Sequence, residues 1–323
     1  MRHQLKTGIR FVFTGWIVWN LAACHSPVRN TDTAGDTPSN PCGFTPPSVP
    51  DSLMKASDRA GYFVVHYWDY FDFADTACIH LPYATEQAFA DYLNILPHAS
   101  GAEATQSIRH VLSRAEKERS GRMYGYFLEL FDKYLYDPNS PYRNEEYYLP
   151  VATYVIDDSR SGEAEKIRMK YAREMMLKNR PGETATDFVY TLPDGKEGRL
   201  HTLKAGYTIL MFYNPDCHGC GQIITALKES SLINKLQKGG TLALLLFYPD
   251  ENRAAWKQHL ADIPASWTNG YDRHTKVKNE ELYDLRAIPS LYLLDKDKKV
   301  VLKDATFEQL EDRLKAQFPL MVY

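Results

Sequence analysis

Two cysteines, Cys217 and Cys220, stand three residues apart directly after an apolar segment. Residues 207–213 are predicted to form a buried strand, residues 214–216 a turn, and the residues from the cysteines onward a helix. The N-terminus of a helix carries unpaired N–H groups and a partial positive charge, which favour a thiolate over a thiol. Because two cysteines at this spacing can also close a disulfide, the pattern predicts a site that gives or takes two electrons.

The length and net charge of the chain indicate how many domains it can form and which partners it can bind. The chain has 323 residues, of which 44% are hydrophobic and 24% charged, enough for two domains that each have a core. Its formal net charge is -3, so nothing indicates the basic surface that nucleic acid requires, and we expect no nucleic-acid partner.

The N-terminus has the pattern of an export signal. Basic residues precede an apolar run over residues 11–23, which is short for a membrane span and typical of a signal peptide. The run ends in Leu-Ala-Ala-Cys, which resembles the lipobox of bacterial lipoproteins, where cleavage precedes a cysteine that is then lipidated. We therefore expect a signal peptide over residues 1–23 and a lipid anchor on Cys24. A plain secretory signal is the alternative. Residues 24–50, rich in Pro, Ser, Thr and Asp, predict a flexible tether.

Export would place the remaining cysteines in an oxidising compartment, where thiols tend to form disulfides. A bridge between Cys42 and Cys78 would close a loop of about 36 residues. Two unpaired cysteines remain the alternative, since spacing does not fix connectivity.

Residues 51–180 are predicted to form an all-α domain, because apolar and aromatic residues recur at helical spacing. Helices are expected at residues 52–74, from residue 85, and at 102–118, 122–135, 145–156 and 161–178. In the first of these, His66, Asp69, Asp72 and Asp75 recur every third residue. They could form a metal-binding face, but three-residue spacing drifts around a helix, which favours a solvated polar face.

In residues 181–323, strands alternate with helices and then close in a hairpin and a helix, which predicts an α/β domain with a mixed sheet covered on both faces. Strands are expected at 188–192, 199–203, 207–213, 242–248, 291–294 and 300–302. One helix should run from the cysteines through Leu236, and another should be capped by Asp250. A capping box of Thr306 and Gln309 should open the last helix.

This arrangement resembles the thioredoxin fold, and most closely the TlpA/ResA-like branch of thiol-disulfide oxidoreductases, over residues 181–318. The resemblance rests on the strand-turn-C-x-x-C-helix, on the sequence Ala-Ile-Pro-Ser at residues 287–290, and on an entry hairpin at residues 182–188 and 194–196. It implies a cis peptide bond between Ile288 and Pro289 that faces the cysteines, with both residues holding an extended partner chain. The helical region resembles a lipoprotein domain of unknown function that is fused to such modules.

The site departs from the pattern of that branch at four positions. Asp216 replaces the tryptophan usual before the first cysteine, and Gly219 replaces the proline usual before the second. The carboxylate that can shuttle the proton of the second cysteine is replaced by Met211 and Ile223 at its two usual positions. Asp216 should disfavour a thiolate at Cys217, whereas His218, when protonated, should favour it, so we expect both to tune the site.

The sequence thus predicts a membrane-tethered thiol-disulfide oxidoreductase in which Cys217 attacks and Cys220 resolves. The expected partners are exported proteins with disulfides or dithiols, and an upstream electron donor or acceptor. We expect a location in the cell envelope, lipid-anchored through Cys24 and facing the periplasm. Neither a cofactor nor a metal is expected.

Three alternatives stay open at this point. A redox-inactive binding or scaffold lipoprotein would use the thioredoxin-like module structurally, with a static Cys217–Cys220 bridge. A peroxidase of the peroxiredoxin kind normally has Thr or Ser three residues before its cysteine, where this chain has Asn214. A zinc site would have one C-x-x-C and only His201 and His218 nearby, which is half of a usual ligand set.

Overall fold

The computed structural model describes residue 42 and residues 44–321. The predicted signal peptide (residues 1–23), the predicted lipidation site Cys24 and the predicted tether through residue 41 lie outside the described residues. The described residues group into one compact unit. Within the described residues, no helix has the length and apolar character needed to cross a membrane.

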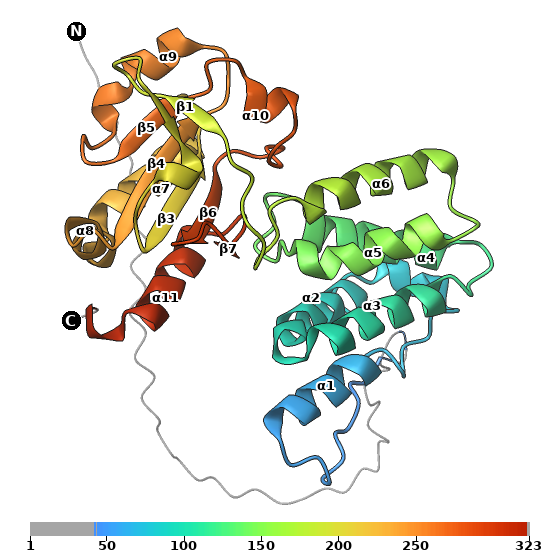
Figure 1. The fold of residues 1–323 in the computed structure, drawn as a ribbon. Helices are drawn as coiled ribbons and strands as arrows, with labels where there is room; N and C mark the ends of the chain where they lie inside the picture. Colours follow the sequence, from blue (N-terminus) through green and yellow to red (C-terminus); the bar gives the residue numbers. More distant parts are fainter. Residues whose placement is uncertain (1–41, 43, 322–323) are drawn as a thin grey trace, which may run out of the picture. The chain divides into compact units, whose positions relative to one another are not determined.

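Six α-helices make up the first part of the described chain, coloured blue to light green in Figure 1. They are α1 (Ala56–His66), α2 (Thr85–Ile95), α3 (Gly101–Ala115), α4 (Arg122–Phe131), α5 (Glu145–Asp157) and α6 (Glu163–Leu177). Short 3-10 turns lie at Thr76–His80 and Leu96–His98, and a π-helical turn, Asp132–Tyr136, extends α4. The helical region predicted from the sequence is confirmed.

Helix α1 is shorter than predicted, because it ends at His66 and not at residue 74. Five large aromatic residues follow; Tyr70 is 62% exposed, but the other four are at most 6% exposed: Tyr67, Trp68, Phe71 and Phe73. A continuous helix would spread these side chains around its axis, whereas turns let all of them reach the core. Burial of aromatic surface therefore overrides the helical periodicity here.

The polar residues of this segment do not form one helix face. The Nδ1 atom of His66 lies 2.7 Å from Oδ2 of Asp69, and Asp75 caps the following 3-10 turn by accepting from the N–H of Ala77. Asp72 accepts from the N–H of Ala74 in another turn. No group of three or more His, Cys, Asp or Glu side chains in the described residues is placed to hold a metal ion.

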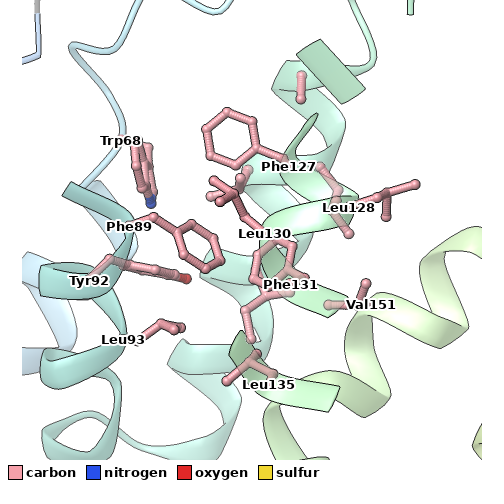
Figure 2. Packing of buried hydrophobic residues seen from close by; sticks show 14 of the residues in the cluster. Trp68, Phe89, Tyr92, Leu93, Phe127, Leu128, Leu130, Phe131, Leu135 and Val151 are labelled. Carbon is pink, nitrogen blue, oxygen red and sulfur yellow. The ribbon is translucent and has the colours of Figure 1, made fainter. Parts of the chain in front are cut away.

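Aromatic rings fill the core of the helical region (Figure 2). Trp68 meets Phe127 edge-on, with ring centroids 5.3 Å apart, and Phe89 meets Phe131 at 4.9 Å. Edge-to-face contacts of this kind add about 0.5–1.5 kcal/mol each to the burial of the rings. The abundance of tyrosine and phenylalanine in this region is thus explained by packing.

A disulfide joins Cys42 to Cys78 across 36 positions of sequence. Both residues belong to the buried cluster of the helical region. The structure therefore pairs the two cysteines whose connectivity the sequence leaves open, and fixes the start of the described chain to the 3-10 turn Thr76–His80.

The second part of the chain is a seven-stranded mixed sheet, coloured yellow to red in Figure 1. Its strands are β1 (Val189–Thr191), β2 (Glu197–Arg199), β3 (Tyr207–Phe212), β4 (Leu242–Tyr248), β5 (Thr268–Tyr271), β6 (Ser290–Asp295) and β7 (Val300–Leu302), in the spatial order β2-β1-β5-β4-β3-β6-β7. The strands β3, β4 and β5 are parallel, and β6 pairs with β3 in the opposite direction. The predicted mixed sheet is confirmed.

Both faces of the sheet are buried, as predicted. Side chains of β3 alternate between two apolar clusters: Ile209 and Met211 face one, and Leu210 and Phe212 the other. Helices α7 (His218–Glu229), α8 (Ser231–Lys238) and α11 (Phe307–Gln317) contribute to the first cluster. The second includes residues before β3 and Val277 of α10 (Lys276–Asn279). The remaining helix is α9 (Arg253–Gln258).

Three predictions of element ends in the sheet region are wrong. The strand expected at 199–203 ends at Arg199 and continues as a 3-10 turn, Leu200–Thr202. The helix expected through Leu236 breaks at Ser230, whose extended backbone and Oγ cap α8 by accepting from the N–H of Ile233. Asn252, and not Asp250, caps α9 by accepting from the N–H of Ala255. By contrast, the capping box of Thr306 and Gln309 is confirmed at α11.

Candidate functional site

The two cysteines lie at the first turn of α7, which β3 and the turn after it deliver to one end of the sheet. Cys217 is the N-cap residue, and its Sγ accepts from the N–H of Cys220 at 3.3 Å. The helix therefore directs a backbone donor and its partial positive charge at the sulfur of Cys217. Both cysteines are free thiols in the structure.

The two sulfurs have different surroundings. Cys217 is half-buried, whereas Cys220 is only 1% exposed. Burial raises the pKa of the Cys220 thiol, and its hydrogen bond with Cys217 raises it further. The N–H of Asn214 donates to Sγ of Cys220 at 3.5 Å, and this hydrogen bond lowers the pKa of the thiol. The more exposed cysteine is Cys217, as the sequence predicts.

A cis peptide bond joins Ile288 to Pro289 and faces the cysteines. The thiol of Cys217 donates to the carbonyl oxygen of Ile288 at 3.5 Å. A Cβ atom added to Gly219 would meet Cδ of Pro289 at 3.6 Å, so this proline lies beside the C-x-x-C turn. The predicted cis bond and its position are confirmed, while partner binding by Ile288 and Pro289 stays a prediction.

Titratable side chains lie near the exposed side of Cys217. Asp216 has a side chain 70% exposed, and its Oδ1 lies 3.8 Å from Nε2 of His259. The other ring nitrogen of His259 lies 2.8 Å from Oδ2 of Asp262. His218, the first residue of α7, is exposed. The structure thus adds His259 to the predicted pair of Asp216 and His218, and no local pattern in the sequence could have indicated it.

An open groove of about 740 Å³ runs beside Cys217 along α7. Its lining residues come from the turn before the helix and from the exposed face of its first three turns: Pro215, Asp216, Cys217, His218, Gly221, Gln222, Thr225, Ala226 and Glu229. The attacking sulfur is therefore reachable from a surface long enough to hold part of another chain.

A buried polar cluster lies on the Cys220 side of the sheet. The hydroxyl of Tyr213 and the indole N–H of Trp256 both donate to Oδ1 of Asn269, at 2.8 and 3.1 Å. Burial raises the pKa of Tyr213 to about 12, so its hydroxyl keeps its proton at neutral pH. The sequence does not indicate Asn269 and Trp256 as site residues, since they come from β5 and α9 and meet Tyr213 only in the fold.

The positions of the usual proton-shuttling carboxylate are apolar in space as well as in sequence. Met211 is fully buried in the cluster beneath α7, and Ile223 packs against that cluster. His201 makes its contact elsewhere, because its Nε2 lies 2.8 Å from the carbonyl oxygen of Ala185. The described residues thus bring together Cys217, Cys220, Ile288 and Pro289, and leave His201 outside the group.

A parallel strand that leads into a helix beginning at C-x-x-C, with a cis-proline opposite the sulfurs, defines a thioredoxin-like domain. Comparisons agree with this class. A family model described as AhpC/TSA family matches residues 181–303, and one described as domain of unknown function DUF5106 matches residues 23–179.

Comparison with individual proteins specifies which thioredoxin-like proteins this chain is similar to. A thiol-disulfide oxidoreductase ResA from a strain of Bacillus cereus is 30% identical over 141 residues, which cover 43% of this chain and 79% of that protein. ResA of Bacillus anthracis is 29% identical over 141 residues, which cover the same fractions of the two chains. The crystal structure of a thioredoxin-like protein from Bacteroides caccae is 44% identical, with a TM-score of 0.80 over 84% of this chain and 98% of that one. The chain therefore belongs to the thioredoxin-like family related to ResA, with its AhpC/TSA-type domain preceded by a DUF5106 domain.

Proposed function

We propose that this protein is a membrane-tethered thiol-disulfide oxidoreductase that exchanges disulfides with exported proteins. Its domain is thiol-disulfide oxidoreductase-like by homology to ResA. The observation that carries the proposal is the placement of Cys217 at the N-cap of α7, half-buried and within 3.5 Å of the carbonyl oxygen of Ile288, with Cys220 buried behind it. This is the arrangement that an attacking and a resolving thiol require.

In the proposed reaction, the thiolate of Cys217 bonds to one sulfur of a partner disulfide. The other partner sulfur leaves as a thiolate and takes up a proton. Cys220 then loses its proton and attacks Sγ of Cys217, which closes the intramolecular disulfide and releases the second partner sulfur as a thiol. The partner gains two electrons and this chain loses two, which an upstream electron donor returns. In the reverse direction the same steps oxidise a partner dithiol with the help of an electron acceptor.

Other residues support these steps in the proposal. Ile288 and Pro289 hold the partner as an extended segment beside Cys217, and the groove along α7 gives that segment room. His218 and Asp216 adjust the charge next to the attacking sulfur. The location is the cell envelope, facing the periplasm. Support for the lipid anchor on Cys24 comes from the lipobox-like sequence at the end of the apolar run.

The test is the redox midpoint of the Cys217–Cys220 couple in the chain from residue 26 onward. Thiols are trapped in glutathione or dithiothreitol buffers, and mass spectrometry of peptides separates this pair from Cys42–Cys78. We expect a reversible two-electron couple, below roughly -250 mV for a reductant and above roughly -180 mV for an oxidant. A pair that never traps in both forms would support the scaffold alternative. A Cys217→Ser variant that still reduces insulin at the wild-type rate would also rule out the proposal.

A further inference from the structure

The loop that carries the cis-proline is held at both ends by charged groups. Before it, the backbone N–H of Arg286 donates to Oδ1 of Asp284 at 3.1 Å, and the guanidinium of Arg286 forms an ion pair with Oδ2 of Asp284, also at 3.1 Å. After it, the hydroxyl of Ser290, the residue next to Pro289, donates to Oδ1 of Asp304. The side chains of Asp284 and Asp304 are each only 5% exposed, so both anchors are shielded from water.

Residues of the helical region bind Arg286 before the loop and Asp304 after it. Oε1 of Glu145, the first residue of α5, accepts from Nη2 of Arg286 at 2.7 Å. Nη2 of Arg143 donates to Oδ2 of Asp304 at 2.7 Å, and also to Oε1 of Glu145 at 3.2 Å. Glu145 is therefore joined to the segment before Ile288 directly, and to the residue after Pro289 through Arg143 and Asp304.

Glu145 has a third cationic partner. The ammonium group of Lys303 lies 2.8 Å from Oε2 of Glu145, and also donates to the carbonyl oxygen of Lys178 at 2.7 Å. The side chains of Glu145 and Lys303 are only 8% and 6% exposed. The guanidinium of Arg286 in turn stacks on the ring of Tyr136, 3.6 Å from its centroid. Three cations and three anions of the described chain thus form one buried cluster around the loop.

Such a cluster is a poor way to gain stability, because desolvation of each ion costs several kcal/mol and offsets most of the attraction. Its geometric effect is larger, since each charge is restrained by more than one partner. The contacts also concentrate on one stretch of chain: Tyr171 donates to the carboxylate of Glu281, and Asn179 to the carbonyl oxygen of Leu282. The helical region therefore contacts the segment that leads into the site loop.

From this geometry we propose that Glu145 is a positioning residue for the redox site, and that the DUF5106 region serves to hold the cis-proline loop in register with Cys217. The inference rests on the proposed function, in which Ile288 and Pro289 receive the partner chain. Glu145 touches neither sulfur. It acts through Arg286 on one side of the loop and through Arg143, Asp304 and Ser290 on the other.

The experiment compares Glu145→Gln with Glu146→Gln in the full chain purified in detergent. Glu146 is the matched control, because it is the next residue of α5 but forms an ion pair with Arg180 on the surface. Two probes are reduced by each variant: insulin, which docks as a chain, and 5,5′-dithiobis(2-nitrobenzoate), which is too small to need the loop. For Glu145→Gln we expect kcat/KM for insulin to fall about tenfold, mainly through KM, with less than about twofold change for the small disulfide.

A second readout does not depend on activity. Amide hydrogen exchange of residues 284–290 should become about tenfold faster in Glu145→Gln and stay unchanged in Glu146→Gln. If Glu145→Gln does not fold, Ser290→Ala removes one bond of the same chain of contacts with little change in volume, and the same results are expected.

The outcomes separate the two proposals. A folded Glu145→Gln with unchanged exchange in the loop and an unchanged ratio of the two rates would overturn the positioning role. The same changes in Glu146→Gln would overturn it as well. A wild-type protein that reduces neither probe would contradict the proposed function, while hydrogen exchange would still decide whether Glu145 holds the loop.

Discussion

Cys217 and Cys220 lie in one helical turn, yet the surroundings of their sulfur atoms differ. The sulfur of Cys217 lies at the N-cap, where it accepts a backbone hydrogen bond and borders an open groove. Cys220 points into the apolar cluster beneath α7 and is 1% exposed. At the scale of the residue, the difference in chemistry between the two comes from position along the helix, because Cys217 caps the N-terminus of α7 whereas Cys220 lies in its first turn and packs into the apolar cluster.

This asymmetry predicts selective labelling of the reduced protein. Iodoacetamide at pH 7 should alkylate Cys217 at least about tenfold faster than Cys220, because Cys220 is buried and the thiolate is the reacting form. Burial raises the pKa of Cys220, so its thiol stays protonated as the pH increases from 7 to 9. Labelling of Cys220 should therefore not increase over this range. Mass spectrometry of the alkylated peptides measures both rates.

Unfolding provides the control for that labelling. In guanidinium chloride both cysteines lose their surroundings, and their rates should come within about twofold of each other. Equal rates in the folded protein, or a steep increase for Cys220 between pH 7 and 8, would contradict the burial on which the prediction depends.

At the scale of the element, a single carboxylate joins α2 to the end of α4. Glu86, in the first turn of α2, accepts from the ammonium of Lys133 and from the hydroxyl of Tyr134 at 2.8 Å. Both donors lie in the π-helical turn Asp132–Tyr136. The hydrogen bonds from Lys133 and Tyr134 lower the pKa of Glu86. The π-turn thus has a local function, because it brings two consecutive donors to the same acceptor.

Replacement of this carboxylate should give a pH-dependent loss of stability. Because the folded-state pKa is below the unfolded one, the carboxylate stabilises the fold above about pH 4.3 and loses that effect as the pH falls through the lower folded value. We expect Glu86→Gln to lower the free energy of unfolding by about 1 kcal/mol at pH 7. The difference from wild type should shrink toward zero near pH 3. Urea denaturation followed by far-ultraviolet circular dichroism measures it.

The exposed Glu129 of α4 offers a matched control for that measurement. Glu129→Gln changes charge equally and should leave the free energy of unfolding within about 0.5 kcal/mol of wild type. A Glu86→Gln effect that is the same at pH 7 and pH 3 would show that packing, and not the charge, is responsible.

The elements that sequence patterns predict well are those whose signal is local. The strands β3 and β4 are long apolar runs, and the capping box at α11 is two residues three apart. The strand β5 was missed because Thr-Asn-Gly-Tyr has no apolar run, and only pairing with β4 and β1 makes it a strand. The predicted end of α1 was wrong, because burial of aromatic rings in the core determines where this helix ends.

The residues of the candidate site also divide into those with a local sequence signal and those without one. Cys217, Cys220 and the cis bond before Pro289 were predictable, since a short motif or a family resemblance specifies each. His259 and Asn269 were not, because they reach the site from other elements and their residue types are common on any helix or strand. Glu145 was missed for the same reason.

At the scale of the whole molecule, the apolar residues fall into separate cores. One cluster contains buried residues between positions 42 and 176, and the other two contain residues between 185 and 314. Among the described residues these clusters share no member, and the contacts that join the helical region to the sheet region include the buried charges around Glu145. Because apolar burial supplies most of the cooperativity of folding, the two regions should lose structure as two units.

The Cys42–Cys78 bridge tests this division, since it belongs only to the helical core. Closing a loop of 36 residues stabilises a fold by roughly 3–4 kcal/mol in the chain-entropy model. In the double variant Cys42→Ser with Cys78→Ser, hydrogen exchange should become faster across residues 56–177 and stay near the wild-type rate across residues 207–271, which exclude the loop that Glu145 restrains. Mass spectrometry of peptic peptides resolves the two ranges in one experiment. Equal loss of protection in both would contradict two units, and would mean that the charges around Glu145 couple the cores into one cooperative fold.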